Sequence, residues 1–447
     1  MIKNMLVVIA LLSFSAQSQT LIKGTLNPPQ EFSWIVLYQL QGTKQLYIKN
    51  VTITNGEFTI DLPENTPEGM YRLLYSQQNN GFVDFIYNGK SVELSFNPDN
   101  PLESVAFLNS EENSTYQNYL IDYSNQQQTL DSLQVNYFSV QDEIDKTNTL
   151  NLYTTEFKKQ QKIQETYETL TKEFLANHFI KANKKYYSEQ LFDTPQEYLN
   201  SEKEHYFDFL DFTDKQLLNS TFLSEKVIDY VFYLNGSEDV EMQNGLYKES
   251  VNEVINRLGD DLNLRSDMLM LLLHSFSQIE NTVLLDFVMD NYYLKLPEQL
   301  QDQSFLSQIH EKVRLAIGKT APEITWEENG IQKKLSELSI AKIYIVVFWS
   351  TGCSHCLVEI PQLYEFTKEK ENIHVIGHTL ENDDIGFNIY TPKYEKWTNI
   401  LGLEKWQNPM VKEYQITATP TYFILDEHKK IIAKPDYFRD VKAFFED

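Results

Sequence analysis

The pattern of apolar residues changes character twice along this chain, and the two changes limit the folds that it can adopt. The first change falls near Pro98 and Pro101, and the second falls at Gly318. The chain has 447 residues, and the common domain size of roughly 100 to 200 residues predicts about three domains. We therefore expect a multidomain α+β protein in which three segments of different class follow a short leader.

Short strand-like runs fill the first segment, residues 20–99. Turn signals separate these runs, and Asn55-Gly56 between two alternating runs is typical of a hairpin. The expected strands are 21–26, 34–40, 45–53, 57–62, 71–75, 83–87 and 92–96. They predict a small antiparallel sandwich or barrel, of which we take the β-sandwich as the expected form.

Glycine and proline become scarce in the second segment, residues 100–316, where Leu, Glu, Gln and Lys dominate. Apolar residues recur there at three and four positions, as at Leu130, Leu133 and Tyr137, which predicts several helices. The most apolar stretch, 268–273, is too short to cross a bilayer and suits a buried helix. We expect an all-α middle domain.

Strand and helix signals alternate in the third segment, residues 318–447. The run 342–349 is almost continuously β-branched or aromatic, which is typical of a central strand buried on both faces. Further strands are expected at 374–378, 421–425 and 431–434, and helices at 353–370, around 394–401 and from 440 onward. This alternation predicts an α/β layer fold.

The first 18 residues have the features of a signal peptide. Lys3 precedes the apolar run 5–14, and the small residues of Ser15-Ala16-Gln17-Ser18 follow. The run is too short to span a bilayer stably, and no later run approaches about 18 residues. No cysteine follows closely enough for a lipoprotein anchor. We expect a soluble periplasmic protein without a membrane span after signal cleavage.

The chain carries 64 acidic against 38 basic residues, a net charge of −26. Such a surface repels nucleic acid phosphates and anionic lipid headgroups through general electrostatics. We therefore expect no nucleic acid partner.

The only two cysteines are Cys353 and Cys356, and two residues separate them. Structural disulfides elsewhere are therefore excluded, which favours a functional role for the close pair. The sequence places Cys353 between a strand and a helix, where unpaired N–H groups and the helix dipole favour a thiolate. Since only a thiolate attacks a disulfide, we expect Cys353 to be the nucleophile. Cys356, one turn later, is placed to resolve the mixed disulfide.

Two neighbours of this pair have alternative interpretations. His355 can add positive charge beside Cys353, or it can be an exposed histidine with little effect. Glu359, three positions after Cys356, can exchange a proton with it on a helix, or it can be a solvated carboxylate. The sequence leaves both choices open.

A zinc site is the structural alternative for a Cys-x-x-Cys pair. Structural zinc needs four ligands, and the chain offers two thiols and no histidine pair at a suitable spacing. We expect neither a metal nor a cofactor.

A proline precedes an apolar strand in the run Ala418-Thr419-Pro420-Thr421. It could be a simple entry turn. After a Cys-x-x-Cys pair we favour a cis-proline, whose bend exposes backbone groups to an extended substrate strand.

These motifs together resemble the thioredoxin superfamily, and more narrowly the exported TlpA/ResA-like thiol:disulfide oxidoreductases. The resemblance rests on Gly-x-x-Ala-Pro from Gly318, Phe-Trp-x-x-x-Cys-x-x-Cys, Glu-Ile-Pro from Glu359, and Thr-Pro-Thr around Pro420. It implies a thioredoxin fold over 318–447 and a cis Pro420. It also implies catalytic roles near the cysteines and a substrate side formed by Trp349, Thr419 and Pro420. The β segment looks like the small domain found ahead of such domains.

The resemblance also implies partners and has departures. The expected partners are thiols or disulfides of exported proteins, together with a membrane or periplasmic redox partner. Gly352 stands where an aromatic residue usually precedes the first cysteine, and Val347 stands where cytoplasmic thioredoxin has a buried Asp. The rival hypothesis is a non-catalytic binding or stress-response module with a vestigial thioredoxin-like domain. A peroxidase is a weaker alternative.

Overall fold

The computed structural model describes residues 20–77, 81–328 and 330–446, and the expected signal peptide lies outside them. The chain divides into two compact units, of which the first ends at Met268 and the second begins at Leu269. Together they contain a strand-rich, a helical and an α/β segment, which confirms the multidomain α+β prediction. The division falls within helix α9 (Leu262–Gln278), and the domain borders at 100 and 318 stay a prediction.

The first unit begins with two four-stranded sheets among its described residues, in the orders β4-β1-β7-β8 and β3-β2-β5-β6. Alternate side chains of these strands share one apolar core, which includes Ile22, Leu37 and Tyr71. The prediction that all strands of this segment are antiparallel is wrong for one pair. β1 and β7 pair in parallel, and the remaining pairs are antiparallel. The strands are β1 Leu21–Leu26, β2 Trp34–Gln41, β3 Lys44–Thr52, β4 Glu57–Asp61, β5 Gly69–Leu74, β6 Phe82–Tyr87, β7 Val92–Phe96 and β8 Ala106–Phe107.

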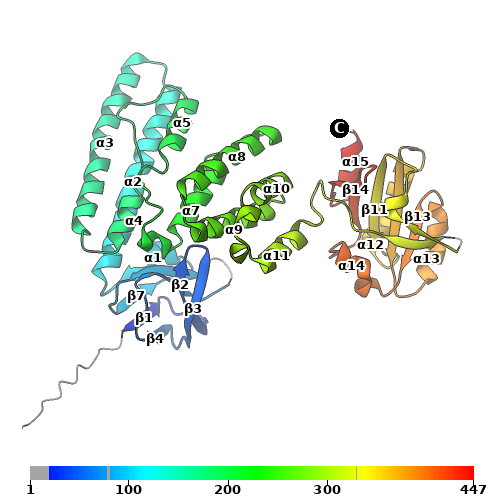
Figure 1. Ribbon diagram of the computed structural model, residues 1–447, viewed down its shortest axis with the longest axis horizontal. Helices are drawn as coiled ribbons and strands as arrows, with labels where there is room; N and C mark the ends of the chain where they lie inside the picture. The colour runs from blue at the N-terminus through cyan, green and yellow to red at the C-terminus, as the bar shows by residue number, and fades with distance from the viewer. Residues whose placement is uncertain (1–19, 78–80, 329, 447) are drawn as a thin grey trace, which may run out of the picture. The chain divides into compact units, whose positions relative to one another are not determined.

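Helices follow in the same unit, and α2 and α3 form a long antiparallel pair (Figure 1). The Ser110 side chain accepts from the Asn113 N–H at the start of α2, which satisfies a free donor there. Asn113 also forms hydrogen bonds of 2.7 and 2.8 Å with the backbone of Ile86 in β6, which fix α2 to the sheet. The helices are α1 Pro101–Ser104, α2 Glu111–Ser139, α3 Glu143–Leu170, α4 Ala176–Ala182, α5 Pro195–His205, α6 Lys215–Leu218, α7 Phe222–Ile228 and α8 Val240–Arg257.

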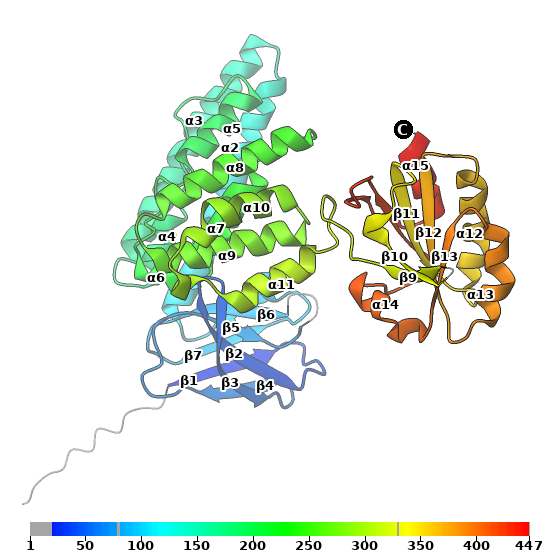
Figure 2. The ribbon, with the colours of Figure 1, turned by 45° about the vertical axis from the view of Figure 1, so that its right-hand side comes forward.

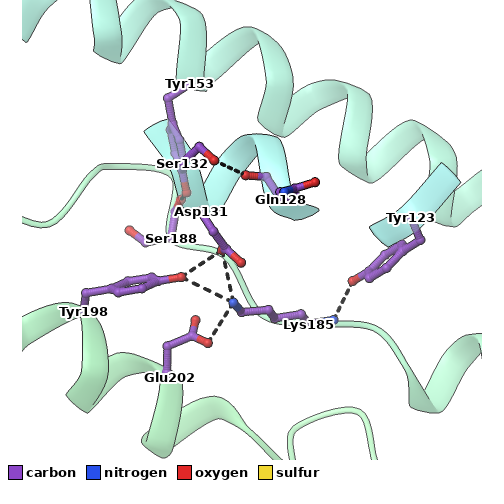
Figure 3. A network of polar contacts seen from close by, with 9 residues as sticks. All are labelled: Tyr123, Gln128, Asp131, Ser132, Tyr153, Lys185, Ser188, Tyr198 and Glu202. Atoms are coloured by element: carbon purple, nitrogen blue, oxygen red, sulfur yellow. Dashed lines mark hydrogen bonds and ion pairs between the residues drawn. The ribbon is translucent and has the colours of Figure 1, made fainter. Parts of the chain in front are cut away.

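A polar network ties α2 to α5 through the segment that follows α4 (Figure 3). The Lys185 ammonium group lies 2.8 Å from Glu202 and 3.2 Å from Asp131. The Tyr198 hydroxyl donates to Asp131 at 2.8 Å, and the Tyr123 hydroxyl accepts from the Lys185 N–H at 2.7 Å. One cation thus holds two carboxylates from different helices.

The second unit places its central sheet in the order β13-β12-β11-β14-β15. β11, β12 and β13 are parallel, and β14 runs antiparallel to β11. β11 is buried along nearly its whole length, as its sequence predicted. The strands are β9 Thr325–Glu328, β10 Ile331–Lys334, β11 Ile343–Trp349, β12 Ile373–Leu380, β13 Thr398–Gly402, β14 Thr421–Leu425 and β15 Ile431–Ala433.

Helices cover both faces of this sheet (Figure 2). α12 and α15 share one face, where Phe366 packs against Phe438 and Phe445. Met410 and Val411 of α14 pack against the core of the other face. The helices of the unit after α9 are α10 Thr282–Asn291, α11 Gln303–Val313, α12 Ser354–Thr367, α13 Ile385–Tyr390, α14 Pro409–Glu413 and α15 Phe438–Glu446.

The helix predicted around 394–401 is wrong, because Thr398–Gly402 forms the edge strand β13. Tyr394, Trp397 and Ile400 follow each other at the spacing of one apolar helix face. In the structure Tyr394 and Trp397 join the core under α12, whereas Ile400 joins the core on the opposite face. The apparent periodicity arose from a turn that leads into a strand.

Candidate active site

The two cysteines lie where the central strand meets a helix. β11 ends at Trp349, and Cys353 is the N-cap residue of α12. The Cys353 N–H donates to the carbonyl of Ser350 at 3.2 Å, which closes the turn between strand and helix. The Cys353 sulfur accepts from the Cys356 N–H at 3.2 Å, so it takes the place that a capping oxygen usually has. The positive end of the helix dipole therefore faces this sulfur.

The two thiols are free and differ in exposure and acidity. Cys353 is partly exposed, whereas Cys356 is fully buried. Partial burial by itself would raise the pKa of Cys353. Hydrogen bonds from the Cys356 thiol and from the N–H groups of Cys356 and His355 outweigh it and lower that pKa below its ordinary value. Burial, followed by the neighbouring Cys353 sulfur, raises the pKa of Cys356 to about 12. Cys353 is therefore the thiol that ionises first.

A cis peptide bond joins Thr419 to Pro420, in agreement with the geometry that the resemblance implies. The Cys353 thiol donates to the carbonyl of Thr419 at 3.2 Å. The register explains this contact, because β14 pairs its first residue, Thr421, with Phe348 near the end of β11. The loop before β14 thus returns to the cysteines from far along the chain.

Glu359 is held in place rather than freely solvated. Its Oε2 atom accepts hydrogen bonds from the Tyr422 hydroxyl and from the Phe438 N–H, both at 2.8 Å. These bonds join α12 to β14 and to the start of α15. Burial, and then the Glu359 carboxylate, raise the pKa of Tyr422 above its ordinary value, so the hydroxyl remains a donor.

Tyr422 is not among the site residues that the sequence predicted. Its position two residues after Pro420 in an alternating strand was the available signal, because it places the side chain on the sheet face that α12 covers. Its partner Glu359 lies 63 positions earlier, and no local pattern links the two.

The structure places His355 at the surface and Trp349 in the core. His355 is exposed, and its ring has no hydrogen-bond or ionic partner within the described part of the chain. Its backbone N–H is the group that contributes to the acidity of Cys353. Trp349 is 0% exposed and packs 6.0 Å from the ring of Tyr394, measured between centroids. Its side chain therefore belongs to the core beneath the site, and the predicted contact of this side chain with substrate is wrong because the ring has no exposed surface.

No group of three or more His, Cys, Asp or Glu side chains among residues 20–77, 81–328 and 330–446 could hold a metal ion. In the same residues no helix is long and apolar enough to cross a membrane.

Comparison with family models finds similarity in the C-terminal part of the chain. Residues 316–436 match the family model described as Redoxin. A thiol-disulfide oxidoreductase ResA of Bacillus cereus is 26% identical over 136 residues, which cover 28% of this chain and 72% of that protein. ResA of Geobacillus thermodenitrificans is 26% identical over 149 residues, covering 30% and 80% of the two chains.

Solved structures are similar to parts of the chain of different length. A domain of a possible thiol-disulfide isomerase from Cytophaga hutchinsonii is 28% identical, covers 30% of this chain and 92% of its own, and has a TM-score of 0.26. A thioredoxin-like protein from Bacteroides caccae is 15% identical over 59% of this chain and 97% of its own, with a TM-score of 0.36. The family match and the curated relatives carry the conclusion. Residues 316–436 are a Redoxin domain of the thioredoxin superfamily, similar to the ResA thiol-disulfide oxidoreductases, as the motifs of this part of the chain predicted.

Proposed function

We propose that this chain is an extracytoplasmic thiol:disulfide oxidoreductase that exchanges disulfides with exported proteins through Cys353 and Cys356. The observation that carries the proposal is the opposite shift of the two thiol pKa values beside a cis-proline loop. The similarity to proteins named thiol-disulfide oxidoreductases supports the reaction class. The signal-like residues 1–18 support export.

The exchange proceeds in two balanced steps. The Cys353 thiolate attacks one sulfur of a substrate disulfide, which forms a mixed disulfide and releases the other substrate sulfur as a thiolate that takes up a proton. Cys356 then loses its proton and attacks the Cys353 sulfur. The second substrate thiol leaves, and the Cys353–Cys356 disulfide remains. The substrate gains two electrons and two protons, and a redox partner that carries thiols restores the dithiol. The same steps in reverse oxidise a substrate.

The surrounding residues have supporting roles in this proposal. Burial disfavours the Cys356 thiolate, so the second step requires a proton acceptor. Glu359, three positions later on the same helix, is that acceptor, either directly or through one water. Thr419 and Pro420 present backbone groups to an extended substrate segment. His355 adds positive charge at the exposed side when it is protonated.

Two cysteine variants test the function. Cys353→Ser removes the nucleophile and abolishes reduction of a protein disulfide such as that of insulin with dithiothreitol as electron donor. Cys356→Ser removes the resolving thiol and accumulates a mixed disulfide that dithiothreitol releases. Ser354→Ala, at an exposed neighbouring position, serves as the matched control and keeps activity.

Retained turnover in Cys353→Ser would reject the proposed oxidoreductase function. A pair that does not equilibrate with glutathione in the unmodified protein would favour the binding-module hypothesis instead.

A further inference from the structure

Gly352 has no side chain. The ammonium group of Lys405, which belongs to another loop, lies near the position that a side chain at residue 352 would occupy. A Cβ atom built on Gly352 would lie 3.7 Å from the Ser350 hydroxyl and 3.9 Å from the Lys405 ammonium nitrogen. Gly352 directly precedes Cys353. The Lys405 nitrogen therefore lies close to the residue that directly precedes the nucleophile Cys353.

Hydrogen bonds of the Glu381 side chain and backbone attach the Lys405 loop to the active-site loop. The Glu381 carboxylate accepts from the Thr351 N–H at 2.5 Å. The Glu381 carbonyl accepts from the Lys405 N–H at 3.1 Å, and the Glu381 N–H donates to Gly402 at 2.9 Å. Glu381 thus holds both loops. Because it directly follows β12, the position of Lys405 near Gly352 is set by the edge of the central sheet where β12 and β13 end.

The backbone of this loop adopts a conformation that side chains disfavour. Glu404 and Lys405 are consecutive non-glycine residues with φ of 67° and 44°. The Asn408 side chain, which donates to the Leu403 carbonyl at 2.9 Å, helps to hold the turn. Disfavoured backbone persists where the surrounding structure enforces it, and such positions concentrate at binding sites.

The Lys405 ammonium group is available for a ligand. Its side chain is half-buried, and no carboxylate within the described residues pairs with it. Leu403 and Trp406, on either side of the turn, are each 48% exposed. The loop therefore offers one unpaired cation and two apolar side chains next to Gly352, a combination that suits a protein segment.

We propose that Lys405 determines substrate specificity by binding a carboxylate next to the reacting cysteine of a protein disulfide. This inference rests on the proposed oxidoreductase function and assigns its substrate class as protein segments with Asp or Glu beside the cysteine. The acidic net charge of the chain, −26, does not oppose it at close range. At about 0.15 M salt the Debye length is about 8 Å, so charges next to the docked segment outweigh distant ones.

Two synthetic peptide disulfides that differ only in Glu or Lys beside the cysteine test the proposal. Reduction of each is measured with the full-length protein, dithiothreitol and about 0.15 M salt. The unmodified protein reduces the Glu peptide with a kcat/KM about three- to fivefold higher, which is the range of an exposed ion pair. Lys405→Gln removes this preference, and Lys405→Glu reverses it. The difference resides mainly in KM, because the contact exists before the reaction.

Lys430→Glu is the matched control. It makes the same charge change after β14, whose first residue pairs with Phe348 near the cysteines and whose last residue pairs with Tyr344 at the opposite end of β11. Lys430 is exposed, and the variant leaves the peptide preference unchanged. Equal rates for both peptides, unaltered in Lys405→Gln and Lys405→Glu, overturn the specificity proposal and leave the oxidoreductase intact. Failure of the unmodified protein to reduce either peptide rejects the proposed function itself. Lys405→Gln keeps a long side chain and decides the question if Lys405→Glu unfolds.

Discussion

Among single residues, the two thiols have different roles in the exchange because their surroundings shift their pKa values in opposite directions. The Cys353 sulfur accepts a hydrogen bond from the Cys356 N–H at the start of α12, and its thiol lies within hydrogen-bond distance of the Thr419 carbonyl. Cys356 is fully buried beneath it. One helical turn therefore separates a stabilised thiolate from a thiol that keeps its proton.

This difference predicts selective alkylation. Iodoacetamide at neutral pH labels Cys353 first, because its pKa is lowered, and leaves Cys356 unlabelled until the pH approaches about 12 or the protein unfolds. Mass spectrometry of peptides after short reaction times measures the order. Cys356 stays unlabelled in Cys353→Ser as well, since its burial does not depend on the first thiol. Simultaneous labelling of both cysteines in the native protein would contradict this account.

The hydroxyl of Tyr422 provides a second prediction at this scale. Tyr422→Phe removes one of two hydrogen bonds to the same Glu359 oxygen and loosens the carboxylate. Such a positioning bond contributes about 1 kcal/mol, so resolution of the mixed disulfide slows by about fivefold while attack by Cys353 is unchanged. Rapid-mixing measurement of the two steps separates them. Tyr437→Phe, which removes an exposed hydroxyl, leaves both rates as they are.

At the scale of elements, strand β12 carries a buried imidazole that couples stability to pH. His378 is 3% exposed and lies beside Phe348, with 5.1 Å between ring centroids. Burial lowers its pKa to about 4. His374 in the same strand shifts in the same direction, also chiefly through burial. Between pH 4 and the ordinary histidine pKa of about 6.5, the unfolded chain binds a proton that folded β12 excludes.

The sign of the effect follows from this difference in proton binding. The free energy of unfolding of the second unit is highest above pH 6.5 and falls as the pH drops toward 4, by about 3 kcal/mol for His378. Urea unfolding at pH 7.5 and 4.5 measures it. His378→Gln reduces the pH dependence, whereas His428→Gln, at an exposed position, does not. An unchanged pH dependence in His378→Gln would show that this imidazole titrates normally.

The elements also show how far the sequence predicts the fold. Strands with strict alternation, such as β1 and β4, were predicted within one residue, because burial on one face fixes their pattern. The two-stranded sheet of β9 and β10 was missed, since its residues are mostly exposed and carry little periodic signal. In β13, a short edge strand preceded by a turn, the apolar spacing imitated a helix.

The candidate site likewise has features that the sequence predicts and features that it does not. The spacing of the cysteines and the strand-to-helix transition predicted the environment of Cys353, because those features are local. The hydrogen bond between Glu359 and Tyr422, and the position of Lys405 near Gly352, bring together residues more than 50 positions apart. They depend on the strand order around β11, which sequence periodicity does not contain.

At the scale of the whole molecule, the division into two units predicts that each can lose stability without the other. Lys185 offers a test in the first unit, because its ion pairs with Glu202 and Asp131 are mostly shielded, with side-chain exposures of 21%, 16% and 34%. Lys185→Met leaves two carboxylates close together without their cation. Burial already raises the pKa of Glu202, so part of the loss is relieved by protonation. We expect the first unit to be destabilised by about 2–4 kcal/mol.

Two probes distinguish the units in this variant. Far-ultraviolet circular dichroism follows the long helices α2 and α3 of the first unit, whereas alkylation of Cys356 reports exposure of the second. In Lys185→Met the helical signal is lost at lower denaturant, while Cys356 becomes reactive at the same concentration as before. Lys184→Met removes an exposed neighbouring lysine that lies 4.4 Å from the Phe209 ring centroid and forms no ion pair with the described residues, and it shifts neither probe. If both probes shift together in Lys185→Met, the chain unfolds as one cooperative body, and the active site depends on the helical network for its stability.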